Sequence, residues 1–258
     1  MGILNVTPDS FYDGGKYLQL KNQLKQVEMM LKDGASVIDV GGMSSRPGST
    51  DVAVDDELKR VLKVIASIHL KFPEAIISID TWNSSVAEKS IANGASVIND
   101  ISGGTHDSKM FGVAARYKVP FIINHMKGTP AQMQKKPSYE DVTAEVNQFF
   151  KKQIDLASKE GVEQFILDPG FGFGKSLEHN FRLLKDLELF KKFSWPLLVG
   201  ISRKSMVNQV IDTKPSEALN GSNVLNSIAI MNGASLIRTH DVKETIEAIK
   251  LIACYHSI

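Results

Sequence analysis

Short apolar runs with the character of β-strands alternate with longer amphipathic runs along the whole chain, and this alternation limits the folds open to it. Several of the short runs are almost continuously apolar, which is typical of strands buried on both faces of a parallel sheet. The predicted strands are Ile3–Val6, Ser36–Val40, Ala75–Ile79, Ser96–Asn99, Val119–Asn124, Gln164–Leu167, Pro196–Ile201 and Ser235–Arg238.

Helical patterns separate these strands, with apolar residues recurring every three or four positions. The predicted helices are Tyr17–Lys32, Asp55–Leu70, Ser84–Ala92, Lys109–Tyr117, Asn147–Ala157, Phe181–Leu189, Glu217–Asn232 and Val242–Ile252. No polar linker divides the chain. Strict alternation therefore predicts an α/β fold, a single-domain (β/α)8 TIM barrel over residues 1–258, with a doubly wound open sheet as the alternative.

Composition agrees with this fold and excludes several classes of protein. The chain has 258 residues and a net charge of +1, so no basic field points to nucleic acid or a membrane surface. Cys254 is the only cysteine, which excludes an internal disulfide and a multi-cysteine metal site. There is no apolar run near the ~20 residues that span a bilayer and no signal-peptide pattern, so a cytoplasmic protein is expected.

Polar residues stand at or just beyond the end of every predicted strand. They are Asn5, Asp39, Asp80, Asn99, Asn124, Asp168, Ser202 and Arg238. One such residue alone could cap a helix or fix a turn. In a barrel, however, the carboxyl ends of the strands converge on the face that holds the active site, so the full set predicts a shared site.

Asp80, Asp168 and Asn99 are expected in one mouth. Carboxylates there can bind a metal, act as an acid–base pair or accept hydrogen bonds from an amidine-like edge, and the spacing leaves all three open. No His/Glu pair has zinc-site spacing. Asn offers a donor and an acceptor while Asp accepts two donors, which suits a flat heterocycle.

Three loops carry further candidates: residues 41–48, the glycine-rich residues 168–175 and the basic residues 202–205. Glycines let backbone approach a ligand closely, and two Phe rings in the second loop can stack on one. The cations of the predicted rim are Arg46, Lys204, Arg238 and His240. They indicate an anionic ligand such as a phosphate, although no P-loop motif is present.

Taken in order, these motifs resemble the dihydropteroate synthase family over nearly the whole chain. The matching blocks are residues 1–11, 39–42 with 45–48, 78–81, 98–100, 125–128, 168–175, 200–205 and 238–242. The resemblance implies a transferase of folate biosynthesis. It would condense a 7,8-dihydropterin bearing a hydroxymethyl diphosphate with p-aminobenzoate, giving dihydropteroate and diphosphate.

The resemblance also implies roles for particular residues. Asp80, Asn99 and Asp168 would bind the pterin edge, Lys204 would reach the pterin carbonyl side and the p-aminobenzoate pocket, and Arg238 would stack on the pterin face. The p-aminobenzoate site would be lined by Ser45, Pro47, Phe173 and Ser205. The diphosphate would be handled by Asn5, Arg46, Arg238 and His240, with Mg²⁺ as cofactor held partly by the Asn5 oxygen.

The implied mechanism is dissociative, and its candidate catalytic residues are Asn5, Arg46, Lys204, Arg238 and His240. Mg²⁺ and the cations stabilise the leaving diphosphate, the C–O bond breaks, and the arylamine attacks the resulting cation. The loops from Thr7 to Gly15 and from Met43 to Val52 are expected to close and exclude water.

Two departures from the family stand in the second loop: Met43 replaces the usual Glu and Ser45 the usual Thr. The chain also begins inside its first strand. We therefore expect either a barrel whose bottom has no covering segment or a piece of a longer protein.

The rival readings are a methyltetrahydrofolate methyltransferase-like domain and a non-catalytic pterin-binding module. The apolar helix Ala218–Met231 could pack against a second subunit, as in the family's usual homodimer.

Overall fold

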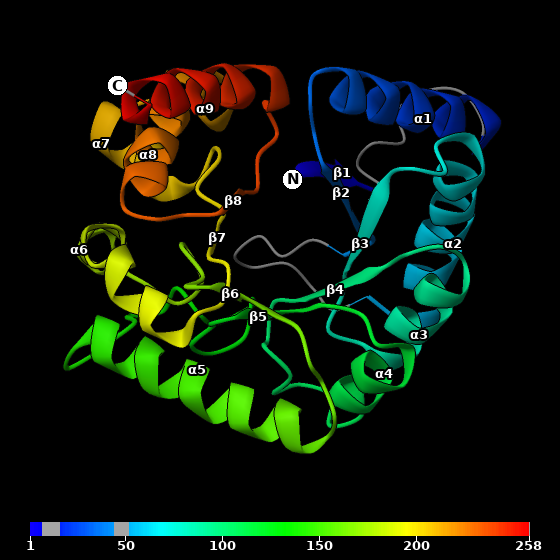
Figure 1. Cartoon of the computed structure of the whole chain (residues 1–258), viewed down its shortest axis with the longest axis horizontal. Coiled ribbons are helices and arrows are strands. Elements are labelled where there is room, and N and C mark those ends of the chain that lie inside the picture. Colours follow the sequence, from blue (N-terminus) through cyan, green and yellow to red (C-terminus); the bar gives the residue numbers. More distant parts are fainter. Residues whose placement is uncertain (7–15, 44–51, 258) are drawn as a thin grey trace.

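A ring of helices surrounds a core of parallel strands in the computed structural model, which describes residues 1–6, 16–43 and 52–257 (Figure 1). The strands are β1 (Gly2–Asn5), β2 (Val37–Gly41), β3 (Ile76–Asp80), β4 (Val97–Asp100), β5 (Phe121–Asn124), β6 (Phe165–Asp168), β7 (Leu198–Val199) and β8 (Leu236–Ile237). Strands β1 to β6 pair in chain order, and β7 pairs with β8.

Two isolated bridges close these sheets into a barrel. Leu167 of β6 pairs with Leu197, just before β7, and Gly2 of β1 pairs with Thr239, just after β8. The predicted (β/α)8 barrel is therefore confirmed, and the open doubly wound sheet is wrong. Strands β7 and β8 are shorter than predicted, in part because Pro196 has no N–H to donate and serves only as acceptor for the Leu167 N–H.

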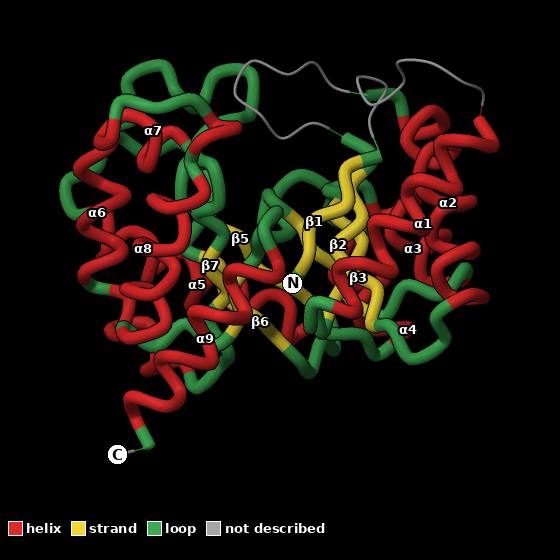
Figure 2. The backbone as a smooth tube through the Cα atoms, turned by 90° about the horizontal axis from the view of Figure 1, so that it is seen from above, coloured by secondary structure: helices red, strands yellow, loops and turns green. Residues whose placement is uncertain are grey.

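The helices lie outside the strands, as the view from above also shows (Figure 2). They are α1 (Lys16–Lys32), α2 (Val54–Lys71), α3 (Ser84–Ala92), α4 (Met110–Tyr117), α5 (Val142–Lys159), α6 (Leu177–Lys185), α7 (Ser205–Ile211), α8 (Leu219–Met231) and α9 (Val242–His256), with short 3₁₀ helices η2 (Leu187–Phe193) and η3 (Pro215–Glu217). All the predicted helices are present within a few residues. Helix α7 was missed because seven residues are too few to display a helical period.

Side chains alternate along the strands between two apolar environments. Ile98, Ile123 and Val199 pack in the large cluster between sheet and helices. Their neighbours Val97, Ile122 and Leu198 form a separate cluster with Met1, Ile166 and Leu236. We identify this second cluster as the interior of the barrel, because successive residues of a strand face opposite sides of the sheet.

The same alternation places polar residues above that interior cluster. Two positions beyond Val97, Ile166 and Leu236 stand Asn99, Asp168 and Arg238. Asp80 of β3 is level with Asn99 of β4. Five of the predicted strand-end residues therefore share the mouth of the barrel: Asp80, Asn99, Asn124, Asp168 and Arg238. Among the described helices, none has the length and apolar character needed to cross a membrane.

Candidate active site

A pocket opens at the carboxyl ends of the strands and contains half of the predicted site residues. It is lined by Asp80, Asn99, Ile101, Asn124, Asp168, Phe173, Gly200, Lys204 and Arg238. Strands β3, β4, β5 and β6 and the segments after β6, β7 and β8 all contribute. The prediction that Asp80, Asn99, Asp168, Lys204, Phe173 and Arg238 share one site is thus supported by their positions.

Arg238 crosses the pocket between two carboxylates. Its Nε donates to Asp39 Oδ2 at 2.7 Å and its Nη2 donates to Asp80 Oδ2 at 2.8 Å. Burial opposes its charge, but Asp39 and Asp80 raise the pKa of Arg238 above its usual value. Burial raises the pKa of Asp80, and the Arg238 guanidinium opposes that rise. Two residues predicted to bind substrate are thus paired with each other.

Asp39 is the site residue that motif reasoning left without a role. Its side chain is wholly buried, and Oδ2 accepts a second hydrogen bond from Asn99 Nδ2 at 3.1 Å. The available signal was its position at the end of a predicted strand. No motif could show that it joins Asn99 and Arg238, because those residues lie 60 and 199 positions away in the chain.

Lys204 lies between the Asp168 side of the pocket and an aromatic ring. Its Nζ donates to the Phe171 carbonyl at 2.5 Å and stands 4.6 Å from the centre of the Phe173 ring. Burial lowers the pKa of Lys204 to about 8, and the negative charge of Asp168 opposes that fall. Burial also raises the pKa of Asp168, whose Oδ1 accepts from the Gly170 N–H at 2.7 Å.

The glycine-rich loop of residues 168–175 is held by a buried lysine that sequence reasoning missed. Lys175 Nζ bonds to the carbonyls of Gly170 at 2.9 Å, Phe173 at 3.1 Å and His125 at 3.2 Å. It also lies 2.9 Å from His125 Nδ1. Burial lowers the pKa values of Lys175 and His125. The loop that presents Phe173 is therefore fixed from beneath by one lysine side chain.

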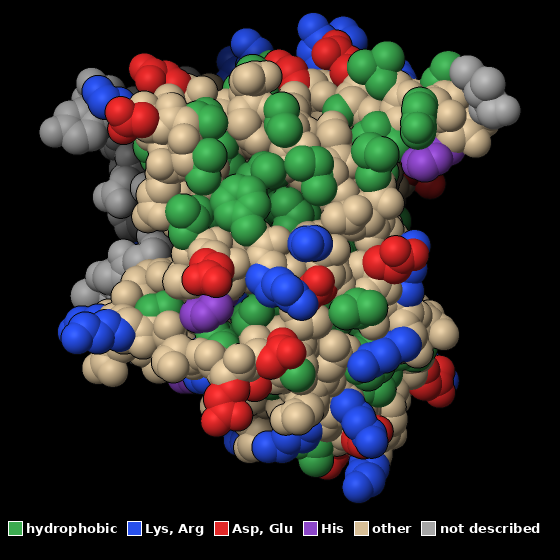
Figure 3. Space-filling view, turned by 90° about the vertical axis from the view of Figure 1, so that its left-hand side faces the viewer, with side chains coloured by type: hydrophobic (Ala, Val, Ile, Leu, Met, Phe, Trp, Pro, Cys, Tyr) green, Lys and Arg blue, Asp and Glu red, His purple; other side chains and the backbone are tan. Residues whose placement is uncertain are grey.

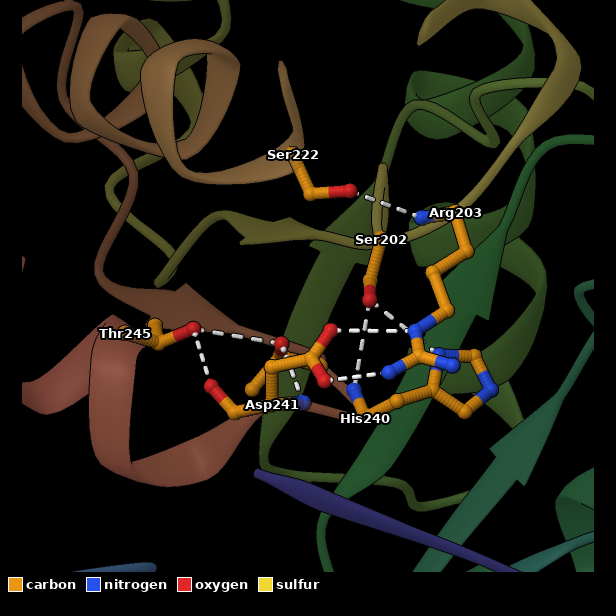
Figure 4. Close-up of polar contacts among 7 residues, drawn as sticks. Ser202, Arg203, Ser222, His240, Asp241 and Thr245 are labelled. Carbon is orange, nitrogen blue, oxygen red and sulfur yellow. Dashed lines mark hydrogen bonds and ion pairs between the residues drawn. The ribbon is translucent and has the colours of Figure 1, made fainter. Parts of the chain in front are cut away.

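A polar cluster joins the loops after β7 and β8 (Figure 4). Ser202 Oγ lies 3.1 Å from His240 Nδ1 and accepts from the His240 N–H at 3.3 Å. Arg203 makes an ion pair with Asp241 at 2.5 Å. Arg203 has a left-handed backbone, φ 58°, and its N–H donates to Ser222 Oγ of α8 at 3.0 Å. The cluster thereby connects the loops that carry Lys204 and His240.

The remaining predicted residues divide into two groups. Asn5 is exposed at the end of β1, level with Gly41 of β2, and His240 is exposed on the loop after β8. Ser205 is exposed as the first residue of α7. Ser45, Arg46 and Pro47 lie outside the described residues, as do the two loops expected to close, apart from their ends at Met43 and Val52.

The donor set of the mouth bears on the expected Mg²⁺. Within the described part of the chain, no group of three or more His, Cys, Asp or Glu side chains could hold a metal ion. Mg²⁺ commonly keeps several waters and binds through substrate phosphates with only one or two protein oxygens. The exposed amide of Asn5 fits that mode of binding, whereas an all-protein cage does not fit.

Comparison with known proteins agrees with this geometry. The pattern of the family described as "Pterin binding enzyme" matches residues 1–240. A dihydropteroate synthase of Escherichia coli (strain K12) is 48% identical over 254 residues, which are 98% of this chain and 89% of that protein.

Solved structures are also close. The Yersinia pestis dihydropteroate synthase, in complex with a sulfonamide drug, has a TM-score of 0.94 and 42% identity, covering 100% of this chain and 94% of that one. The Xanthomonas albilineans dihydropteroate synthase, in complex with 7,8-dihydropteroate, has a TM-score of 0.89 and 32% identity, covering 100% of this chain and 93% of that one.

Proposed function

Because this chain belongs to the pterin-binding enzyme family, we propose that the mouth of its barrel divides into a pterin subsite, an arylamine subsite and a diphosphate subsite. Its activity is that of a dihydropteroate synthase of folate biosynthesis. It condenses 6-hydroxymethyl-7,8-dihydropterin diphosphate with p-aminobenzoate. The rival readings, a methyltransferase-like domain and a non-catalytic module, do not account for this activity.

Asp80, Asn99 and Asp168 form the pterin subsite in this proposal. All three face inward and line one pocket. The 2-amino and ring N–H groups of a pterin are donors, and ionised carboxylates accept two hydrogen bonds in a bidentate manner. The pairing of Asp80 with the Arg238 guanidinium supports the assignment, because a guanidinium offers the same planar set of donors.

Lys204 and Phe173 separate the pterin subsite from the arylamine subsite. The Lys204 ammonium is anchored on the Phe171 carbonyl and faces the Phe173 ring, so it can reach a pterin carbonyl on one side and an aromatic carboxylate on the other. Ser205 follows Lys204 directly at the start of α7. Ser45 and Pro47 complete this subsite in the proposal.

The diphosphate subsite is formed by Arg238, His240, Asn5 and Arg46. Ser202 orients the ring of His240 through Nδ1, and from that orientation Nε2 can donate to an anion. Asn5 would hold Mg²⁺ together with the substrate's diphosphate oxygens. When bound, Mg²⁺ neutralises charge on the leaving group.

The reaction then needs no protein nucleophile. Arg238, His240 and Arg46 stabilise the diphosphate as the C–O bond breaks. The pterin ring carries the resulting positive charge, which the carboxylates of Asp80 and Asp168 would stabilise from the pocket that they line. The amine of p-aminobenzoate attacks the exocyclic carbon, forms the C–N bond and releases one proton to water, while the C–O bonding electrons leave with the diphosphate.

The division of the mouth is tested by substrate-specific kinetics of diphosphate release. Asp168→Asn should raise the KM for the pterin diphosphate about 10- to 100-fold, since bonds to charged groups contribute about 1.5–3 kcal/mol, and leave the KM for p-aminobenzoate within about twofold. Phe173→Ala should have the reverse pattern. If both variants raised both KM values equally, the division would be wrong. No diphosphate release by the folded wild-type protein would overturn the activity.

We also propose a cytoplasmic homodimer, formed through one exposed apolar face. Figure 3 shows hydrophobic side chains gathered on the side of the barrel where α7, α8 and α9 lie. Val224, Ile228 and Met231 follow one another at helical spacing on α8 and are 51%, 40% and 55% exposed. Val210 and Ile211 of the adjacent α7 extend the face. Apolar faces of this kind mark interaction sites.

A further inference from the structure

We propose that Asp39 is a positioning residue of the pterin subsite. It fixes the orientation of the Asn99 amide. It also holds Arg238 through Nε when the substrate binds to the carboxylate of Asp80. The inference rests on the proposed pterin subsite and assigns a role to a residue that does not touch the pocket. It follows from two hydrogen bonds that meet on one buried oxygen.

The position of Asp39 excludes direct contact with substrate. It lies one step below the mouth, level with Ile3 of β1 and Ser78 of β3, and its side chain is 0% exposed. Its second oxygen, Oδ1, has no hydrogen-bond partner among the described residues. A buried ion pair with an unsatisfied oxygen is a weak source of stability. The presence of a buried carboxylate at Asp39 is therefore better explained by its positioning of Asn99 and Arg238 than by a gain in stability.

The first contact determines which atom Asn99 presents to the pocket. An ionised carboxylate only accepts hydrogen bonds, so Asn99 must turn its Nδ2 toward Asp39. The Oδ1 of the same amide then faces away from Asp39. Asn99 also lines the pocket, so it can offer an acceptor to a ring N–H of the pterin. Without the Asp39 charge, the amide is free to flip and offer donors instead.

The second contact determines where Arg238 goes when the pterin binds. Asp80 lines the pocket and is reachable by substrate, whereas Asp39 is not. A pterin that donates to Asp80 must displace the Arg238 Nη2 from it. The bond from Nε to Asp39 keeps the guanidinium beside the pocket. If Asp39 lost its charge, Arg238 would rest on Asp80 alone and compete with substrate for it.

The test is a thermodynamic cycle on pterin diphosphate binding. Asp39→Asn should weaken binding and raise the KM for the pterin diphosphate about 30-fold, with the KM for p-aminobenzoate within about twofold. In a background that carries Arg238→Ala and Asn99→Ala, the same substitution should add less than about threefold. If Asp39→Asn raised the KM as much in that background as in the wild type, its effect would not depend on Asn99 and Arg238, and the proposal would fail.

Two further variants separate positioning from folding. Asp186 also accepts on one oxygen from an arginine Nε, that of Arg182, and from a second side chain, that of Thr143, and it does not line the pocket. Its side chain is 12% exposed, so Asp186→Asn is a control close to Asp39→Asn in chemistry and burial. It should leave pterin binding within about threefold. If Asp39→Asn does not fold, Asp39→Glu keeps the charge but displaces it, and the same selective rise in KM is expected. Wild-type KM values in a folded Asp39 variant would overturn the inference. The proposed pterin subsite fails separately, if Asp168→Asn leaves pterin binding unchanged.

Discussion

Lys204 lines the pocket together with Asp168 and Phe173. Its protonation state should therefore affect the rate of catalysis. Burial lowers its pKa to about 8, against about 10.4 for an ordinary lysine. The ammonium thus loses its proton as the pH rises through about 8, and the neutral amine is a weaker donor to the pterin. We expect kcat/KM for the pterin diphosphate to fall above that pH.

Lys204→Arg provides the control for this pH dependence. A guanidinium stays charged throughout the range, so the variant should be slower at every pH but flat between about pH 7 and 9. The measurement is kcat/KM at intervals of half a pH unit, with folding checked at each pH. A wild-type profile without a decline up to about pH 9 would contradict the prediction.

Gly170 stands at a position of the glycine-rich loop that cannot accept a side chain. Its φ is +71°, and a Cβ built on it would lie 1.9 Å from the His125 carbonyl oxygen. We expect Gly170→Ala to destabilise the protein by about 3 kcal/mol or more, because neither the backbone nor the contact can be accommodated. Gly112 in α4 has nothing within 4 Å of such an atom. Gly112→Ala should stabilise by about 0.5–1 kcal/mol in the same urea titration. Equal effects would refute this reading of the loop.

At the scale of elements, the period of two along each strand made much of the site predictable. The positions of Asp80, Asn99 and Asp168 at the strand ends were enough to predict a shared mouth, and all three line the pocket. Contacts between distant elements could not be read in this way. Lys175 Nζ donates to three carbonyls in two loops, and the sequence contains no pattern that predicts these contacts. Helix α7 was missed for a different reason, since its seven residues contain too few turns for a period.

The connection between the loops after β7 and β8 leads to a prediction at this scale. Arg203 has the left-handed backbone and reaches Asp241 with two N–H groups. Arg203→Ala should free the loop that carries Lys204, and kcat should fall about 10-fold while the melting temperature drops only a few degrees. The ion pair is partly exposed, so its direct contribution to stability is about 1 kcal/mol or less.

A double-mutant cycle isolates this pair from the general effect of truncation. Asp241→Asn should have a similar effect on kcat, and the two substitutions together should be no worse than either alone. Arg116 of α4 and Glu88 of α3 form an exposed ion pair. Its removal is a control for the loss of a surface ion pair elsewhere in the molecule. Additive losses at Arg203 and Asp241 would show that the two loops act independently.

At the scale of the whole molecule, the ring closes through short contacts. Strands β7 and β8 have two residues each, and single bridges at Leu197 and Thr239 connect them to β6 and β1. The helices α7, α8 and α9 lie over this part of the ring (Figure 1). The exposed apolar face proposed for the homodimer belongs to this same region. Association there would support the part of the barrel with the least strand pairing and would leave the mouth open.

The proposed homodimer is tested by placing a charge at the centre of that face. Ile228 is 40% exposed between Val224 and Met231 on α8. Ile228→Glu should convert the protein from a dimer to a monomer of 28.4 kDa, measured by sedimentation or light scattering. A buried unpaired charge at an apolar interface costs several kcal/mol, which is a loss of more than about 100-fold in affinity.

Leu70 of α2 supplies the control, because it is 86% exposed on another helix. Leu70→Glu should leave the mass of the assembly unchanged. A monomeric wild type, or a dimeric Ile228→Glu, would overturn the proposal. None of the exposed apolar residues of that face lines the described pocket. The monomer should therefore keep its affinity for the pterin diphosphate within about threefold and show a lower melting temperature instead.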